Sequence, residues 1–117
     1  MRWTEFRAHI RHLSTEDLER VRQAFELGKD AHSSQKRKSG EPYFTHPIAV
    51  AHLLADMGAD SDTIIAALLH DSIEDTHLTL EMIDKEFDGS VTELVDGVTK
   101  LDEADLKDRP TLEQETE

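Results

Sequence analysis

The sequence predicts an all-α fold, a bundle of about five helices, and three observations lead to this prediction. Along most of the chain, apolar residues recur every three or four positions, which is the spacing of one helical face. Residues that cap or end helices divide these runs into segments of helical length. The alternation of apolar and polar residues that marks a half-buried strand does not stand out.

The first predicted helix begins at Ser14 or Thr15, either of which can cap it, and runs toward Ala31 and His32. Its apolar residues follow helical spacing: Leu18, Val21, Ala24, Phe25, Leu27 and Gly28. Residues 33–42 are expected to form a loop, because they contain turn formers and a cluster of basic residues.

Two apolar helices are predicted after this loop. The first begins with Thr45 as its cap and has Pro47 in its first turn, where a missing N–H costs nothing. Gly58 is expected to end it. The second begins at Ser61 and carries the apolar run 63–69. The short connection predicts that these two helices pack antiparallel.

Two further helices complete the predicted bundle. One begins near Thr79 and ends at Gly89, and the other begins with a capping box formed by Ser90 and Glu93. After this helix the composition changes, since residues 102–117 hold many acids and few apolar side chains. We therefore expect one folded domain over residues 1–101, followed by an acidic and poorly ordered tail.

The composition limits the class of protein. The 117 residues suffice for one domain with its own core. Asp and Glu number 26 against 13 Lys and Arg, a net charge of −13, so the surface as a whole repels nucleic acid and anionic membranes. With 0 Cys, disulfides and thiolate zinc sites are excluded. No apolar stretch approaches the length of a membrane span, and the N-terminus lacks a signal-peptide pattern, so we expect a cytoplasmic protein.

The strongest candidate site is the acidic segment that follows the apolar run. If one helix continues through it, His70 and Glu74 share a face, as do Asp71 and Asp75. Antiparallel packing would bring His46 to the same place. Imidazole and carboxylate ligands together suit Mn, Fe, Zn or Co, and the two later acids could orient or deprotonate a metal-bound water. The alternative is that these are ordinary core or surface residues, as expected of a His-Asp pair taken alone.

A second candidate is the basic cluster of residues 36–38. Beside a metal, its cations could contact a phosphate or a nucleobase, although on composition alone a solvated loop is favoured. The remaining histidines show no comparable spacing and are expected to be structural or surface residues: His9, His12, His32, His52 and His77. Trp3 and Phe6, together with His9, are expected to form an N-terminal packing face.

Four segments in order, residues 37–47, 66–71, 74–76 and 95–101, resemble the hydrolase domain of the RelA/SpoT homologues, the (p)ppGpp synthetases and hydrolases of the stringent response. The resemblance implies an HD-type helical fold that holds Mn²⁺, or another divalent transition metal, and removes the 3′-pyrophosphate from (p)ppGpp. By motif matching it implies metal ligands His46, His70 and Asp71, catalytic acids Glu74 and Asp75, and nucleotide contacts Arg37, Lys38 and Ser39.

One departure from the family pattern limits the expected activity. Family members complete the metal site with an Asp from a downstream Ala-Asp-Lys/Arg-Leu-His-Asn type motif, which this sequence does not contain. We therefore expect a partial HD domain, an N-terminal fragment of a longer enzyme with weak or no activity, which could form homo-oligomers through an exposed apolar face. The alternatives are a fragment of a small standalone alarmone hydrolase and an inactive HD-like regulatory or interaction module.

Overall fold

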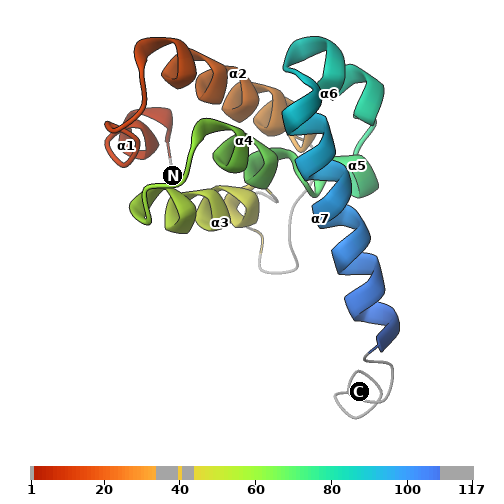
Figure 1. Cartoon of the computed structure of the whole chain (residues 1–117). Coiled ribbons are helices and arrows are strands. Elements are labelled where there is room, and N and C mark those ends of the chain that lie inside the picture. The colour runs from red at the N-terminus through yellow and green to blue at the C-terminus, as the bar shows by residue number, and fades with distance from the viewer. Residues whose placement is uncertain (1, 34–39, 41–43, 109–117) are drawn as a thin grey trace.

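The computed structural model describes residues 2–33, 40 and 44–108, and the regular elements of these segments are all helices (Figure 1). They are α1 (Trp3–Arg7), α2 (Thr15–Ala31), α3 (Thr45–Asp56), α4 (Ser61–Leu69), α5 (Ser72–Asp75), α6 (Leu80–Glu86) and α7 (Gly89–Asp108). The all-α prediction is confirmed. Within the described residues, no helix is both long enough and apolar enough to cross a bilayer.

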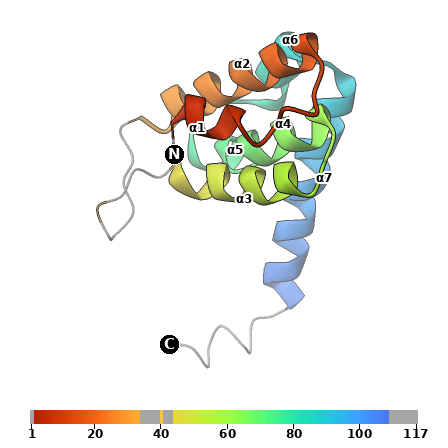
Figure 2. The same ribbon diagram turned by 90° about the vertical axis from the view of Figure 1, so that its left-hand side faces the viewer.

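Helix α4 is the centre of the bundle. It packs against α2, α3 and α7, while α1 lies on α2 and α6 lies on α7 (Figures 1 and 2). Every residue of α4 from Ile64 to Leu69 is buried. A helix that is apolar on all sides needs neighbours on all sides. The apolar run of the sequence therefore explains why the other helices gather around this one.

Two of the predicted helix starts are confirmed. Ser14 Oγ accepts a hydrogen bond from the backbone N–H of Asp17 at 3.2 Å, and α2 follows. Thr79 Oγ1 accepts from the N–H of Met82 at 3.2 Å, and α6 follows. At the other end of a helix, Gly58 has φ +79°, the left-handed conformation that terminates α3 where the sequence predicted.

Three predicted caps were wrong by one or two residues. Thr45 is the first residue of α3, after an N-cap at Phe44 that makes no side-chain bond. Asp60, rather than Ser61, caps α4 by accepting from the N–H of Thr63 at 2.9 Å. At the start of α7 the Oδ1 of Asp88, rather than the predicted Ser90, accepts from the N–H of Val91 at 3.1 Å.

The N-terminal packing face is confirmed for its aromatic members, and it includes a short helix that the sequence did not predict. Phe6 on α1 is fully buried, with its ring centroid 5.7 Å from that of Phe25 on α2. Trp3 lies edge-on to the same ring at 5.5 Å. These contacts hold α1 on α2, whereas five residues alone would not form a stable helix.

Helix α7 continues to Asp108, past the predicted domain boundary at residue 101. Its second half extends away from the other helices (Figures 1 and 2). The remainder of the predicted tail, residues 109–117, lies outside the described residues. The division into a domain and a tail at residue 101 stays a prediction.

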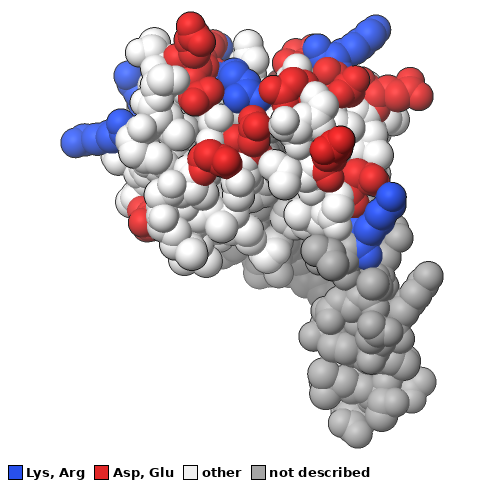
Figure 3. Space-filling model, viewed as in Figure 1, with Lys and Arg blue, Asp and Glu red and all other residues white. Residues whose placement is uncertain are grey.

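A single arginine ties three helices together on the charged side of the molecule. Arg20 on α2 donates to Ser61 Oγ at 3.1 Å and to Asp62 Oδ1 at 2.8 Å at the start of α4, and to Asp88 Oδ2 at 3.3 Å before α7. Acidic side chains gather over α2 and α6 on this side, whereas the surface over α3 carries few charges (Figure 3).

Candidate functional site

His70 and Asp71 lie in a turn between α4 and α5, so the prediction of one continuous helix through this segment was wrong. Helix α4 ends at Leu69, and α5 is a separate helical turn. In a continuing helix the carbonyl of Ala67 would accept from the N–H of Asp71. Here the ring of His70 competes for that carbonyl, with Nδ1 donating to the Ala67 oxygen at 2.7 Å.

The two side chains of this turn face each other at short range. His70 Nε2 lies 3.0 Å from Asp71 Oδ1, and the side chains are only 12% and 21% exposed. Because the Ala67 carbonyl can only accept, Nδ1 of His70 carries a hydrogen, and Nε2 is left as the nitrogen that faces the carboxylate. The pair is thus half-buried, fixed in orientation, and suited to holding a proton or a metal cation.

The surroundings of Asp71 favour its charged form. The hydrogen bond with His70 is the main cause that lowers the pKa of Asp71, and burial works in the opposite direction. The charges of His70, His46 and His32 lower this pKa further. His46 is exposed in the first turn of α3, and its charge is one of the smaller influences that lower the pKa of Asp71. Its role as a third metal ligand stays a prediction.

His32 belongs to this site region, although the sequence interpretation left it among the structural or surface residues. It is 1% exposed, its Nε2 lies 3.4 Å from Ser72 Oγ, and its ring stacks on Phe44 with centroids 6.0 Å apart. A signal was present in the sequence. Val21, Phe25, Gly28 and His32 follow the spacing of one helical face, so His32 continues the buried stripe of α2.

Phe44 connects this buried stripe to the start of α3. Its ring is 4% exposed and packs edge-on against Phe25, with centroids 5.6 Å apart. The ring fits because α2 has Gly28 at the contact, where a Cβ atom would overlap Phe44 and lie 3.3 Å from the carbonyl oxygen of Leu68. The close approach of α2 fixes Phe44 and, two residues later, the backbone of His46.

Several predicted site residues cannot be placed beside this pair. Arg37, Lys38 and Ser39 lie outside the described residues, as does the side chain of Glu74. Asp75 is exposed at the end of α5. The roles predicted for these residues stay predictions.

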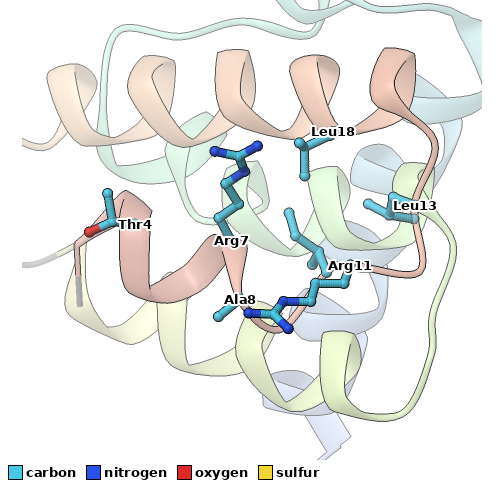
Figure 4. A pocket seen from close by; sticks show the side chains of 7 residues that line it. Thr4, Arg7, Ala8, Arg11, Leu13 and Leu18 are labelled. Atoms are coloured by element: carbon cyan, nitrogen blue, oxygen red, sulfur yellow. The ribbon is translucent and has the colours of Figure 1, made fainter.

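Another hollow of the surface offers no alternative centre. It has a volume of about 440 Å³ and lies between α1, the segment after it and the start of α2 (Figure 4). Arg7 and Arg11 line it, but their guanidinium groups point away from each other rather than converging on a ligand (Figure 4). An anion clamp would need both groups on one side.

Comparison with known proteins identifies the family. Residues 24–117 match the family model described as an HD domain. The chain is 49% identical over 104 residues to the guanosine-3′,5′-bis(diphosphate) 3′-pyrophosphohydrolase of Vibrio cholerae, and 48% identical over 104 residues to the bifunctional (p)ppGpp synthase/hydrolase SpoT of Escherichia coli. This chain is an HD domain of the RelA/SpoT family.

The HD domain is also 56% identical over 86 residues to a probable GTP pyrophosphokinase of Mycobacterium leprae. That match covers 74% of the chain and 11% of the relative. The Vibrio and Escherichia matches each cover 89% of the chain and 15% of the relative. The resemblance drawn from the four sequence motifs is thus confirmed, and the HD domain spans about a seventh of the length of these two relatives.

Proposed function

We propose that this HD domain removes the 3′-pyrophosphate from (p)ppGpp in a reaction that depends on Mn²⁺ bound by His46, His70 and Asp71. The observation that carries the proposal is the His70–Asp71 pair, with an imidazole nitrogen 3.0 Å from a carboxylate oxygen at the end of a buried helix. The relatives in Vibrio and Escherichia are named for this hydrolysis. The substrate is inferred from the names of these relatives, and metal binding is inferred from the His70–Asp71 pair.

The donor set fits a divalent transition metal. An imidazole that donates through one nitrogen to a backbone carbonyl presents the other nitrogen as a ligand in a fixed orientation, and His70 has this arrangement with Ala67. Asp71 keeps its charge because its pKa is lowered by His70. When bound, the metal would lower the pKa of a coordinated water. His46 would add a second imidazole from the start of α3.

The remaining predicted residues have roles that follow from charge. Glu74 and Asp75 would orient the attacking water and accept its proton. Arg37, Lys38 and Ser39 would contact the guanine nucleotide. A chain of net charge −13 repels a pyrophosphate, so a local group of cations is needed to hold the substrate.

Calorimetric titration of manganese into the chain and into a His70→Ala variant tests the metal site. His77→Ala is the matched control, because His77 is an exposed histidine outside the proposed ligand set. We expect the first variant to lose the manganese equivalent bound at His70 and the second variant to keep it. Equal binding by all three proteins would place the metal elsewhere and overturn the assignment.

Pyrophosphate release from ppGpp, measured on the same three samples with and without manganese, tests the reaction. We expect manganese-dependent release that is lost in the His70 variant, and the rate also measures the weak turnover expected of this chain. Release that persists in the His70 variant would contradict the proposed role of the pair.

The cellular role, the location and the oligomeric state of the protein are also proposals. A role in the stringent response and a cytoplasmic location stay predictions. Association with a second copy through an apolar face also stays a prediction; Leu53 on α3 is 65% exposed, and Met57 at the C-cap of α3 is 78% exposed. Size-exclusion chromatography with light scattering gives the oligomeric state directly.

A further inference from the structure

Two histidines and an aspartate form a separate cluster where the segment after α1 meets α3. His9 Nδ1 lies 2.8 Å from Asp56 Oδ1, and His52 Nε2 lies 3.2 Å from Asp56 Oδ2. The two ring nitrogens are 3.2 Å apart. Asp56 ends α3 and His46 stands near its start, about 15 Å away along the helix axis, so this cluster is distinct from the site at His70.

Both ring nitrogens face one carboxylate. The carboxylate only accepts, so without a metal each ring nitrogen that faces it must carry its hydrogen. Neutral His9 and His52 can each donate to a different oxygen of Asp56 in this way. A divalent cation can take the place of both hydrogens, because the two ring nitrogens and the carboxylate then direct their lone pairs at one centre.

The separation of the two ring nitrogens is close to that of neighbouring ligands around a tetrahedral metal. With bonds of about 2.0–2.1 Å to nitrogen and oxygen, neighbouring ligands of tetrahedral zinc lie about 3.3 Å apart. The two ring nitrogens are 3.2 Å apart. His9 Nδ1 lies 2.8 Å from one oxygen of Asp56, and His52 Nε2 lies 3.2 Å from the other. Among the described residues, these three are a group whose ligand atoms all lie within 4.8 Å of one another.

We propose that His9, His52 and Asp56 bind a second divalent transition metal, with Zn²⁺ as the best match to two imidazoles and one carboxylate. The side chains are 36%, 28% and 50% exposed, so solvent can supply the fourth ligand and the ion has a path of entry. His52 and Asp56 are one helical turn apart on α3, and His9 comes from the N-terminal segment. The bound ion fastens this segment to α3.

Zinc titration in a His70→Ala background isolates the second site from the one proposed above. Calorimetry on that variant is expected to show one zinc equivalent, and the equivalent should disappear when Asp56→Ala is added. Asp56 is half exposed at a helix C-terminus, so its removal is tolerated by the fold. No binding in the His70 variant, or binding that survives the added change, would overturn the proposal. Because the His70 site is already removed in this background, the zinc result does not depend on whether the proposed manganese site exists.

Histidine side-chain NMR on the unaltered chain gives a test that requires no variant. Zinc should shift the resonances of His9 Nδ1 and His52 Nε2 and leave those of exposed His77 unchanged. In the His70→Ala background, the melting temperature should rise by several degrees with zinc, return with chelator, and fail to rise when Asp56→Ala is added. His12→Gln is the matched control. Its Nε2 bonds the Ala59 carbonyl at 2.9 Å, so the variant loses a contact of the same segment but should keep the increment from zinc. Unshifted His9 and His52 resonances would refute the site.

Discussion

Replacing Gly28 by alanine tests how tightly α2 approaches the start of α3. Alanine favours the helix over glycine by about 1 kcal/mol. Against this, the new Cβ would overlap the Phe44 ring, which cannot swing aside because it is 4% exposed and lies between Phe25 and His32. Overpacking of this kind costs about 1–3 kcal/mol, so we expect a net loss of roughly 1 kcal/mol and a fall in melting temperature of about 4–8 °C.

The assay is thermal and urea denaturation of Gly28→Ala beside Gly97→Ala. Gly97 is exposed on α7, and a Cβ there meets nothing within 4 Å, so the control should gain about 0.5–1 kcal/mol from helix propensity. Opposite signs for two identical substitutions isolate the effect of packing. Because Phe44 precedes α3, Gly28→Ala should also weaken manganese binding through His46. A Gly28 variant as stable as the control would show that Phe44 yields freely, and would refute the reasoning.

Three further predictions concern an ion pair, a helix cap and a core residue elsewhere in the bundle. Arg20→Ala should cost about 2 kcal/mol in urea denaturation, because it leaves partly buried Asp62 without its cation; a loss below about 0.5 kcal/mol would contradict this. Asp60→Ala should cost about 1 kcal/mol at neutral pH through loss of the cap. The hydrogen bonds with Thr63 lower the folded-state pKa of Asp60, so its contribution is present above the unfolded value of about 3.9 and is lost as pH falls through the folded value. A difference between this variant and the parent that persists in stronger acid would contradict that cause. Ile83→Ala, at a fully buried position of α6, should cost about 2–4 kcal/mol in the same assay, and a near-neutral result would mean that α6 is not packed on α7.

The sequence predicted the long helices because their stability comes from apolar faces, and these can be read from spacing. It misplaced caps where two competent residues stand close together, as Asp60 and Ser61 do, since only the fold decides which side chain reaches the free N–H groups. The break after α4 was hidden for a similar reason: a ring bond from His70 to the Ala67 carbonyl is a local competition that periodicity does not record.

Only some features of the candidate sites could be predicted from the sequence. The pairing of His70 with Asp71 follows from adjacency, whereas the approach of His46, which was inferred from a short connection between two helices, stays a prediction. The cluster at His9 joins residues more than forty positions apart, and no spacing within one segment could reveal it. The burial of His32 could have been predicted, because it continues the spacing of Val21, Phe25 and Gly28.

The central position of α4 has a consequence for synthesis on the ribosome. Residues 64–69 are apolar on all sides, and α7, which covers one of these sides, is made after α1 to α6. A nascent chain that has emerged only as far as α6 therefore exposes an apolar surface on α4. This surface puts it at risk of aggregation or of binding by chaperones. Productive folding must wait until α7 has left the exit tunnel, and any shortened version of this domain should be cut after that helix rather than before it.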